Sequence, residues 1–136
     1  MRVIEFRGKA KNKTDCNCAE DNGFVYGGIA FDDFTGKTYI TRWNSFGLGF
    51  IENIEVDPAT VGQFTGLTDK NGELIYEGDL VNIPGSSRQG LPGEVHWYGL
   101  SCMFSIRRKG YNPVLLDGDT VYEVVGNIYD NPDMLK

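Results

Sequence analysis

The chain has 136 residues, of which 40% are hydrophobic and 12% aromatic, and its formal net charge is −6. A chain of this length and hydrophobic content can form a buried core without disulfides or metal ions, in one domain or in two subdomains. The acidic balance opposes non-specific binding to nucleic-acid phosphates and to anionic membranes. Because the chain contains 18 glycines and five prolines, we expect many tight turns and no long helices.

The first part of the chain has the pattern of short strands separated by turns. Residues 3–7 have the composition of a strand, and the polar residues 9–23 predict a loop. Residues 24–31 predict a second strand, in which two adjacent glycines allow a bulge or a close backbone contact. A turn at residues 32–36 then leads to a strand at residues 37–42, which completes a hairpin.

Residues 43–56 have no assignment from the sequence, but the next segment has a clear helix start. Asp57 can cap free backbone amides, and Pro58 suits the first helical position, where no N–H is needed. Gly62 is expected to end this helix after about one turn, because C-terminal caps favour glycine. We therefore place a boundary after residue 56.

The second half of the chain contains more short strands and turns. Asn71 and Gly72 predict a two-residue hairpin turn, because both tolerate positive φ. A glycine- and serine-containing loop at residues 84–92 is a candidate contact surface, since loops on a rigid scaffold often carry recognition. Strands are predicted at residues 80–83, 93–98, 102–107 and 120–125.

These elements predict a mainly β protein with little helix. Residues 1–56 form a β-rich part, a meander or hairpin, and residues 57–136 form a second part. Short strands at turn-marked spacing favour a small barrel or sandwich for the second part.

Seven short motifs, spread in order over nearly the whole chain, resemble the YopX family of small phage and prophage proteins. They are EFRGK at 5–9, VYG at 25–27, VDP at 56–58, GQFTGL at 62–67, DKNG at 69–72, IYEGD at 75–79 and YEVVGNIY at 122–129. The resemblance implies an SH3-like barrel in the C-terminal half and a β-rich N-terminal part. It implies no activity and no catalytic or binding residues, because the molecular role of the family is uncharacterised. This chain departs from the pattern in the long segment at residues 11–21 and in Phe24, where tryptophan is common.

The cysteines and the single histidine offer one candidate metal site. Cys16 and Cys18 could share a metal ion with His96 and Cys102. However, zinc sites usually separate paired cysteines by two residues, and the other two ligands match no standard zinc motif. Cys102 beside an aromatic residue also suits a buried apolar position. We therefore expect no metal and no other cofactor.

Two further groups of residues could carry chemistry, and each has a simpler interpretation. His96 could act as a general base, but no nucleophile motif accompanies it, and it is expected to face water if Val95 and Trp97 point inward. Asp117, Asp119 and Glu123 could bind a cation, yet they lack the spacing of a calcium loop, so a solvated turn explains them. We therefore expect no enzymatic activity.

Nucleic acid is the alternative partner that the sequence offers. Arg107, Arg108 and Lys109 lie near aromatic residues and could bind through phosphate contacts and stacking. The first thirteen residues form a second basic cluster, with five basic side chains and one acidic one. Both clusters lie on an acidic chain, so any such binding is expected to be weak.

The location and role that we predict follow from these exclusions. The start of the chain lacks the apolar core of a signal peptide, and no apolar run approaches the ~18 residues of a membrane span. Three cysteines, an odd number, favour reduced thiols in the cytoplasm. We expect a phage or prophage binding or adaptor protein that self-associates and contacts another protein of the phage or host. A weak nucleic-acid-associated module is the second hypothesis, and an uncharacterised enzyme the third.

Overall fold

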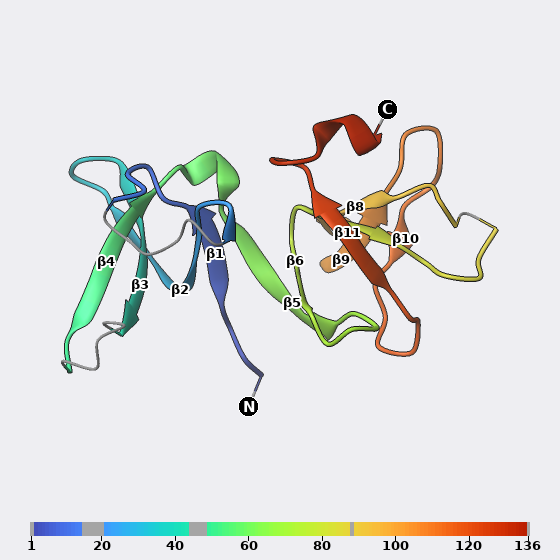
Figure 1. Ribbon diagram of the computed structural model, residues 1–136, viewed down its shortest axis with the longest axis horizontal. Coiled ribbons are helices and arrows are strands. Elements are labelled where there is room, and N and C mark those ends of the chain that lie inside the picture. The colour runs from blue at the N-terminus through green and yellow to red at the C-terminus, as the bar shows by residue number, and fades with distance from the viewer. Residues whose placement is uncertain (1, 15–20, 44–48, 88, 136) are drawn as a thin grey trace. The chain divides into compact units, whose positions relative to one another are not determined.

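The computed structural model describes residues 2–14, 21–43, 49–87 and 89–135 (Figure 1). The chain forms two compact units, Met1–Gln63 and Phe64–Lys136. The division falls some residues beyond the predicted boundary after residue 56. Regular structure in the described residues consists of β-strands and short 3-10 helices, which confirms the prediction of a mainly β protein. No helix in these residues is long and apolar enough to span a membrane.

The first unit is built on an antiparallel sheet with the strand order β4-β3-β2-β1-β5. The predicted hairpin of the second and third strands is confirmed, whereas the first strand starts at Phe6 and not at residue 3. Val3 and Ile4 are exposed instead. The elements are β1 (Phe6–Lys9), β2 (Phe24–Asp32), β3 (Lys37–Trp43), β4 (Ile51–Val56), the 3-10 helix η2 (Pro58–Thr60) and β5 (Gly62–Thr68), which continues into the second unit.

Strand β4, in the stretch left unassigned by the sequence, lets the first unit close on itself. Ala10, just beyond β1, forms a bridge with Val56 at the end of β4. The backbone N–H of Lys11 donates to the carbonyl of Glu55 at 3.0 Å, and that of Asp57 donates to the carbonyl of Lys9 at 2.9 Å. The beginning of the predicted loop at residues 9–23 therefore continues the sheet.

The core of the first unit lies on one face of these strands. Alternate residues of β3 and β4 are buried there, as expected for a sheet with period two. Asp57 caps η2 as predicted, because its carboxylate accepts a hydrogen bond from the N–H of Ala59 at 3.0 Å. Gly62 does not cap the helix but begins β5. The core residues are Ala10, Val25, Ile40, Ile54 and Val56, with Phe6 and Val61 packed against them.

The second unit contains a five-stranded antiparallel sheet with the order β10-β9-β8-β7-β11 (Figure 1). The last strand of this sheet along the chain, β11, pairs with β7, which is its first strand along the chain. The predicted strands are present, except that the last begins at Glu123 and not at residue 120, and β10 was not predicted. The SH3-like designation stays a prediction. The elements are β6 (Leu74–Tyr76), β7 (Asp79–Asn82), β8 (Gly93–Tyr98), β9 (Met103–Arg107), β10 (Val114–Leu115), β11 (Glu123–Asn127) and the 3-10 helix η3 (Pro132–Leu135).

The turn between β5 and β6 is longer than the predicted two-residue turn. Thr68 pairs with Leu74, so the loop includes the residues on both sides of Asn71 and Gly72. Gly72 has a φ of +81°, but Asn71 is not among the residues with positive φ. The side chain of Asp69 organises this loop through hydrogen bonds to its backbone.

The core of the second unit differs from the expected pattern in β8, and just before β11 it includes one of two adjacent apolar residues. Tyr122 is buried, whereas its neighbour Val121 is exposed. Val95 is buried as expected, but Trp97 keeps half of its surface exposed and contacts Phe104 edge-on. The core residues are Ile75, Val81, Val95, Ile106, Leu116 and Tyr122, with Leu67, Ile83, Phe104 and Val124 packed against them.

Candidate functional site

The three basic residues at the end of β9 have different environments. Arg107 is exposed and donates to the carboxylate of Glu94, its cross-strand neighbour, at 2.6 Å. Arg108 is buried, with 6% of its surface accessible, and Lys109 is exposed. Side chains of successive strand residues point to opposite faces, which separates Arg107 from Arg108.

Arg108 is held by the end of the loop between β7 and β8. Its Nε donates to the carbonyl of Leu91 at 2.6 Å. Gly93 provides the space for its stem, since a Cβ atom there would lie 3.0 Å from Cγ of Arg108 and would collide with Ile106. The aliphatic part of an arginine can be buried in this way while its charged end serves a polar contact.

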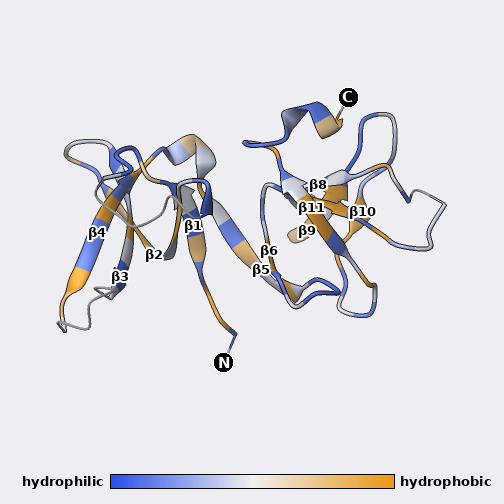
Figure 2. Cartoon of the chain, in the orientation of Figure 1, coloured by the Kyte–Doolittle hydropathy of each residue, from blue (hydrophilic) through white to orange (hydrophobic). Residues whose placement is uncertain are grey.

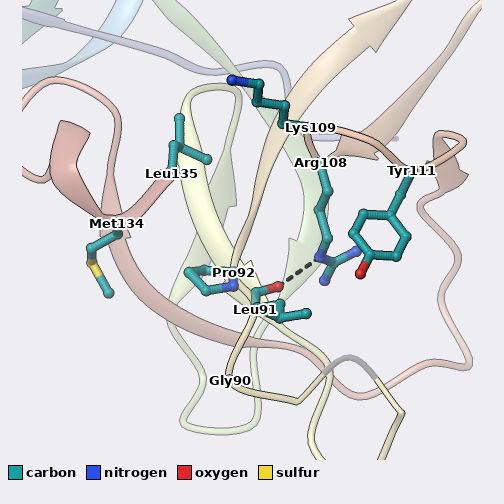
Figure 3. A pocket seen from close by; sticks show the side chains of 8 residues that line it. All are labelled: Gly90, Leu91, Pro92, Arg108, Lys109, Tyr111, Met134 and Leu135. Atoms are coloured by element: carbon teal, nitrogen blue, oxygen red, sulfur yellow. Dashed lines mark hydrogen bonds between the residues drawn. The ribbon is translucent and has the colours of Figure 1, made fainter.

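A tight turn after Arg108 positions Tyr111. The N–H of Tyr111 donates to the carbonyl of Arg108 at 3.2 Å, and Gly110 within this turn has a φ of +82°. Glycine adopts such a conformation without the steric cost that other residues bear. The side chains of Arg108 and Tyr111 both extend toward the loop that ends at Pro92 (Figure 3).

Three segments that are distant in sequence line one pocket of about 280 Å³ in the second unit. The first is the end of the predicted contact loop, the second is the turn after β9, and the third is η3 (Figure 3). Among the described residues that line it, most are apolar or aromatic, and the charged ones are cations. The lining residues are Gly90, Leu91, Pro92, Arg108, Lys109, Tyr111, Met134 and Leu135.

The predicted nucleic-acid cluster is not one exposed basic surface. Arg107 is paired with Glu94, Arg108 is buried, and the side chain of Lys109 extends away from the Leu91 carbonyl that holds Arg108 (Figure 3). Phosphate binding needs several accessible cations that can displace counterions. Nucleic-acid binding by these three residues stays a prediction.

His96 has a partner in the neighbouring strand. Its Nδ1 lies 3.1 Å from Oγ of Ser105, and the two residues are directly paired between β8 and β9. His96 is half-buried, so the expectation that it simply faces water is wrong. Ser105 has no exposed surface, whereas a nucleophilic serine must reach its substrate. We interpret the pair as a structural hydrogen bond across the sheet.

The other candidate ligands are separated or lie outside the described residues. Cys16 and Cys18 are outside them, and Cys102 is exposed, which contradicts its expected burial. Within the described part of the chain, no three His, Cys, Asp or Glu side chains are grouped to hold a metal ion. The absence of a metal stays a prediction.

The carboxylates of the predicted solvated turn do not point at a common centre. Asp117 accepts hydrogen bonds from the N–H groups of Thr120, at 2.7 Å, and Asp119, at 3.0 Å. The side chain and backbone of Thr120, with the backbone of Asp119, hold the pKa of Asp117 below its usual value of 3.8. Glu123 forms an ion pair with Lys70 at 3.0 Å. Asp117 therefore stabilises its own turn, and Glu123 forms an ion pair with Lys70.

A second candidate surface lies at one end of the β3–β4 hairpin in the first unit. Trp43 pairs with Ile51, which places both side chains on the same face of the sheet, opposite the face of Ile40. Trp43 is 69% exposed, Ile51 60% and the adjacent Phe50 52%. The sequence pattern did not predict this surface, because residues 43–56 had no assignment from their composition.

Comparison with known proteins identifies relatives over the full length of the chain. A family model described as YopX protein matches residues 6–136. A crystal structure of the protein yopX from Bacillus subtilis is matched over 100% of this chain and 98% of its own, with a TM-score of 0.55 at 14% identity. The crystal structure of protein EF1440 from Enterococcus faecalis has a TM-score of 0.49 at 21% identity, with 100% of each chain covered. No curated protein matches the chain. The likeness to yopX shows a shared fold.

Proposed function

The chain belongs to the YopX protein family, as its motifs predicted, and we propose that it is a binding or adaptor protein without enzymatic activity. It acts through self-association and through contact with another protein of a phage or of its bacterial host, in the cytoplasm.

The observation that carries this proposal is the exposed apolar end of the β3–β4 hairpin. Large apolar side chains that are exposed singly are common, but an exposed cross-strand pair with a third such residue next to it in sequence favours a contact surface. Tryptophan and phenylalanine are enriched in protein–protein interfaces, where they contribute a large share of the binding energy. Strand β4 is orange at its Ile51 end in Figure 2, in contrast to the hydrophilic residues farther along the strand.

The alternative functions have weaker support. A weak nucleic-acid-associated module would need the basic residues after β9, yet Arg107 is paired and Arg108 is buried. An enzyme would need an accessible nucleophile or base, whereas His96 is half-buried and bonded to a buried serine. Protein contact needs neither arrangement.

Replacement of Trp43 by serine is expected to weaken self-association by about tenfold or more, because a buried tryptophan anchor often contributes over 1.4 kcal/mol. Sedimentation velocity over a range of concentrations measures this as a shift of the oligomer equilibrium toward the monomer. Trp43 is largely exposed in this chain, so its replacement is expected to leave the fold intact.

Leu100→Ser is the matched control, because Leu100 is 88% exposed in the turn between β8 and β9. This variant is expected to keep the wild-type oligomer equilibrium. A monomeric wild-type protein, or an equal response of the two variants, would exclude the β3–β4 end as the self-association surface.

A further inference from the structure

We propose that the pocket between the β7–β8 loop, the turn after β9 and helix η3 binds a short acidic segment of a partner protein, with one large apolar side chain of that segment inserted in the pocket. The inference rests on the proposed function for the class of partner. It concerns the second unit, however, and uses none of the residues of the self-association surface.

The walls of the pocket suit an apolar side chain. Three of the apolar residues that line it are partly exposed: Leu91 and Tyr111 are each 48% exposed, and Met134 is 39% exposed. Pro92 and Leu135 complete the apolar lining. Tyrosine gives a large contact area at a small entropic cost, and methionine adapts its shape to different ligands. These properties are typical of a site that accepts an anchor residue from a partner.

The positive charge of the pocket favours a negatively charged ligand. Among the described residues that line it, the charged ones are two cations, the buried Arg108 and the exposed Lys109. The chain as a whole is acidic, with a net charge of −6, so this is a local reversal of sign. Complementary charges around an apolar anchor speed association and exclude partners of the wrong sign.

The position of Arg108 is fixed before any ligand binds. Its Nε is bonded to the carbonyl of Leu91, and its stem is packed where Gly93 leaves room. A wall that is already ordered loses little conformational entropy on binding, so Arg108 shapes the pocket while the exposed Lys109 is the cation that a ligand can reach. Lys109 is exposed next to Arg108, with its side chain extending away from Leu91 (Figure 3), and a flexible lysine side chain can follow the position of a carboxylate.

The size of the pocket favours a peptide anchor over the other ligands. Its volume of about 280 Å³ lies just below the ~300–1,000 Å³ range of sites that enclose small molecules. A strand of nucleic acid would need a series of accessible cations along its backbone. Here the neighbouring Arg107 is engaged by Glu94, and Arg108 is buried.

The test uses the full chain as bait for a displayed library of random heptapeptides, with the Tyr111→Ala variant for counter-selection. We expect enriched peptides to combine Asp or Glu with Leu, Met or Phe. A fluorescent copy of the most enriched peptide should bind about tenfold more weakly to Tyr111→Ala. Lys109→Gln should weaken binding about threefold, and high salt should remove that difference.

Arg107→Gln is the matched control. It removes one positive charge from the residue two positions before Lys109, but Arg107 does not line the pocket. Its affinity for the peptide should stay within about twofold of the wild type. Circular dichroism is the check that all three variants fold, and Lys109→Gln alters only an exposed side chain.

Several results would overturn the inference. They are no enrichment over the counter-selected variant, enrichment of basic or uncharged peptides, and equal effects of Lys109→Gln and Arg107→Gln. Displacement of the peptide by a single-stranded oligothymidine of equal length would assign the pocket to nucleic acid instead. Loss of peptide binding with an unchanged oligomer equilibrium would leave the self-association of the first unit in place, so the two proposals fail separately.

Discussion

Replacement of Asp69 by alanine is expected to lower the free energy of unfolding by about 3 kcal/mol. Asp69 is buried between β5 and β6, and its carboxylate accepts three backbone hydrogen bonds. The donors are the N–H groups of Asn71 at 2.8 Å, Glu73 at 3.0 Å and Val124 at 3.1 Å. The last of these joins the hairpin loop to β11. Alanine would leave all three donors without this acceptor, and a buried donor without an acceptor costs about 1–3 kcal/mol.

The contribution of Asp69 is expected to depend on pH. Burial alone would raise its pKa, but hydrogen bonds from Val124, Glu73 and Asn71, aided by the charge of Lys70, hold the pKa below its usual value of 3.8. A lowered pKa in the folded state means that the ionised carboxylate stabilises the fold. This stabilisation is fully present above pH ~5 and is lost as the pH falls through the folded pKa, below 3.8.

Urea unfolding at several pH values measures both effects. Asp69→Asn should be less stable than the wild type at neutral pH, and the difference should shrink below pH ~4. Glu73→Ala is the control, because Glu73 is an exposed residue of the same loop and its hydrogen bonds with Asp69 are made by its backbone N–H and carbonyl. A stability loss for Glu73→Ala as large as that for Asp69→Ala, or a difference independent of pH, would show that the Asp69 carboxylate does not organise this loop.

Replacement of Gly27 by alanine is expected to destabilise the first unit by about 3 kcal/mol, at the upper end of the cost of overpacking. Gly27 ends the part of β2 that pairs with β1, and Gly28 begins the part that pairs with β3. A Cβ atom on Gly27 would collide with the backbone carbonyl oxygen of Thr41 in β3. A backbone oxygen in a sheet cannot rotate away, so the two strands would have to separate.

Gly28→Ala is the matched control in the adjacent position. Its Cβ atom would lie 2.8 Å from Oγ1 of Thr41, and this side chain can change rotamer. We expect a loss of about 1 kcal/mol or less for this variant. Amide hydrogen exchange of β2 and β3 reports on the first unit separately, and equal protection in the two variants would contradict the assigned close approach.

The sequence predicted local structure well where one residue type has one dominant physical reason. Asp57 and Pro58 predicted the start of η2, because a carboxylate satisfies a free amide and proline needs no donor. The strands that form the β2–β3 hairpin were predicted from their composition and the turn between them. The candidate contact loop and the basic residues after β9 were also identified, but as separate features.

Tertiary structure decided which of these features meet. Arg107 and Arg108 are adjacent in sequence, yet the first is exposed and the second is buried. Their side chains point to opposite faces, and the loop that contains Leu91 covers Arg108. Just before β11, Tyr122 is buried and its neighbour Val121 is exposed, since adjacent residues of an extended segment point to opposite sides. Composition contains no information about this choice when both residues are apolar.

The family, the mainly β class and the positions of most turns were determined by the sequence itself, because short motifs and turn residues act over a few positions. Only tertiary structure decided two further features. One is the closure of the first unit by Ala10 and Val56, and the other is the pocket that Gly90, Leu135 and residues between them line. Both join segments that lie far apart in the chain, and such contacts depend on the packing of all the strands between them.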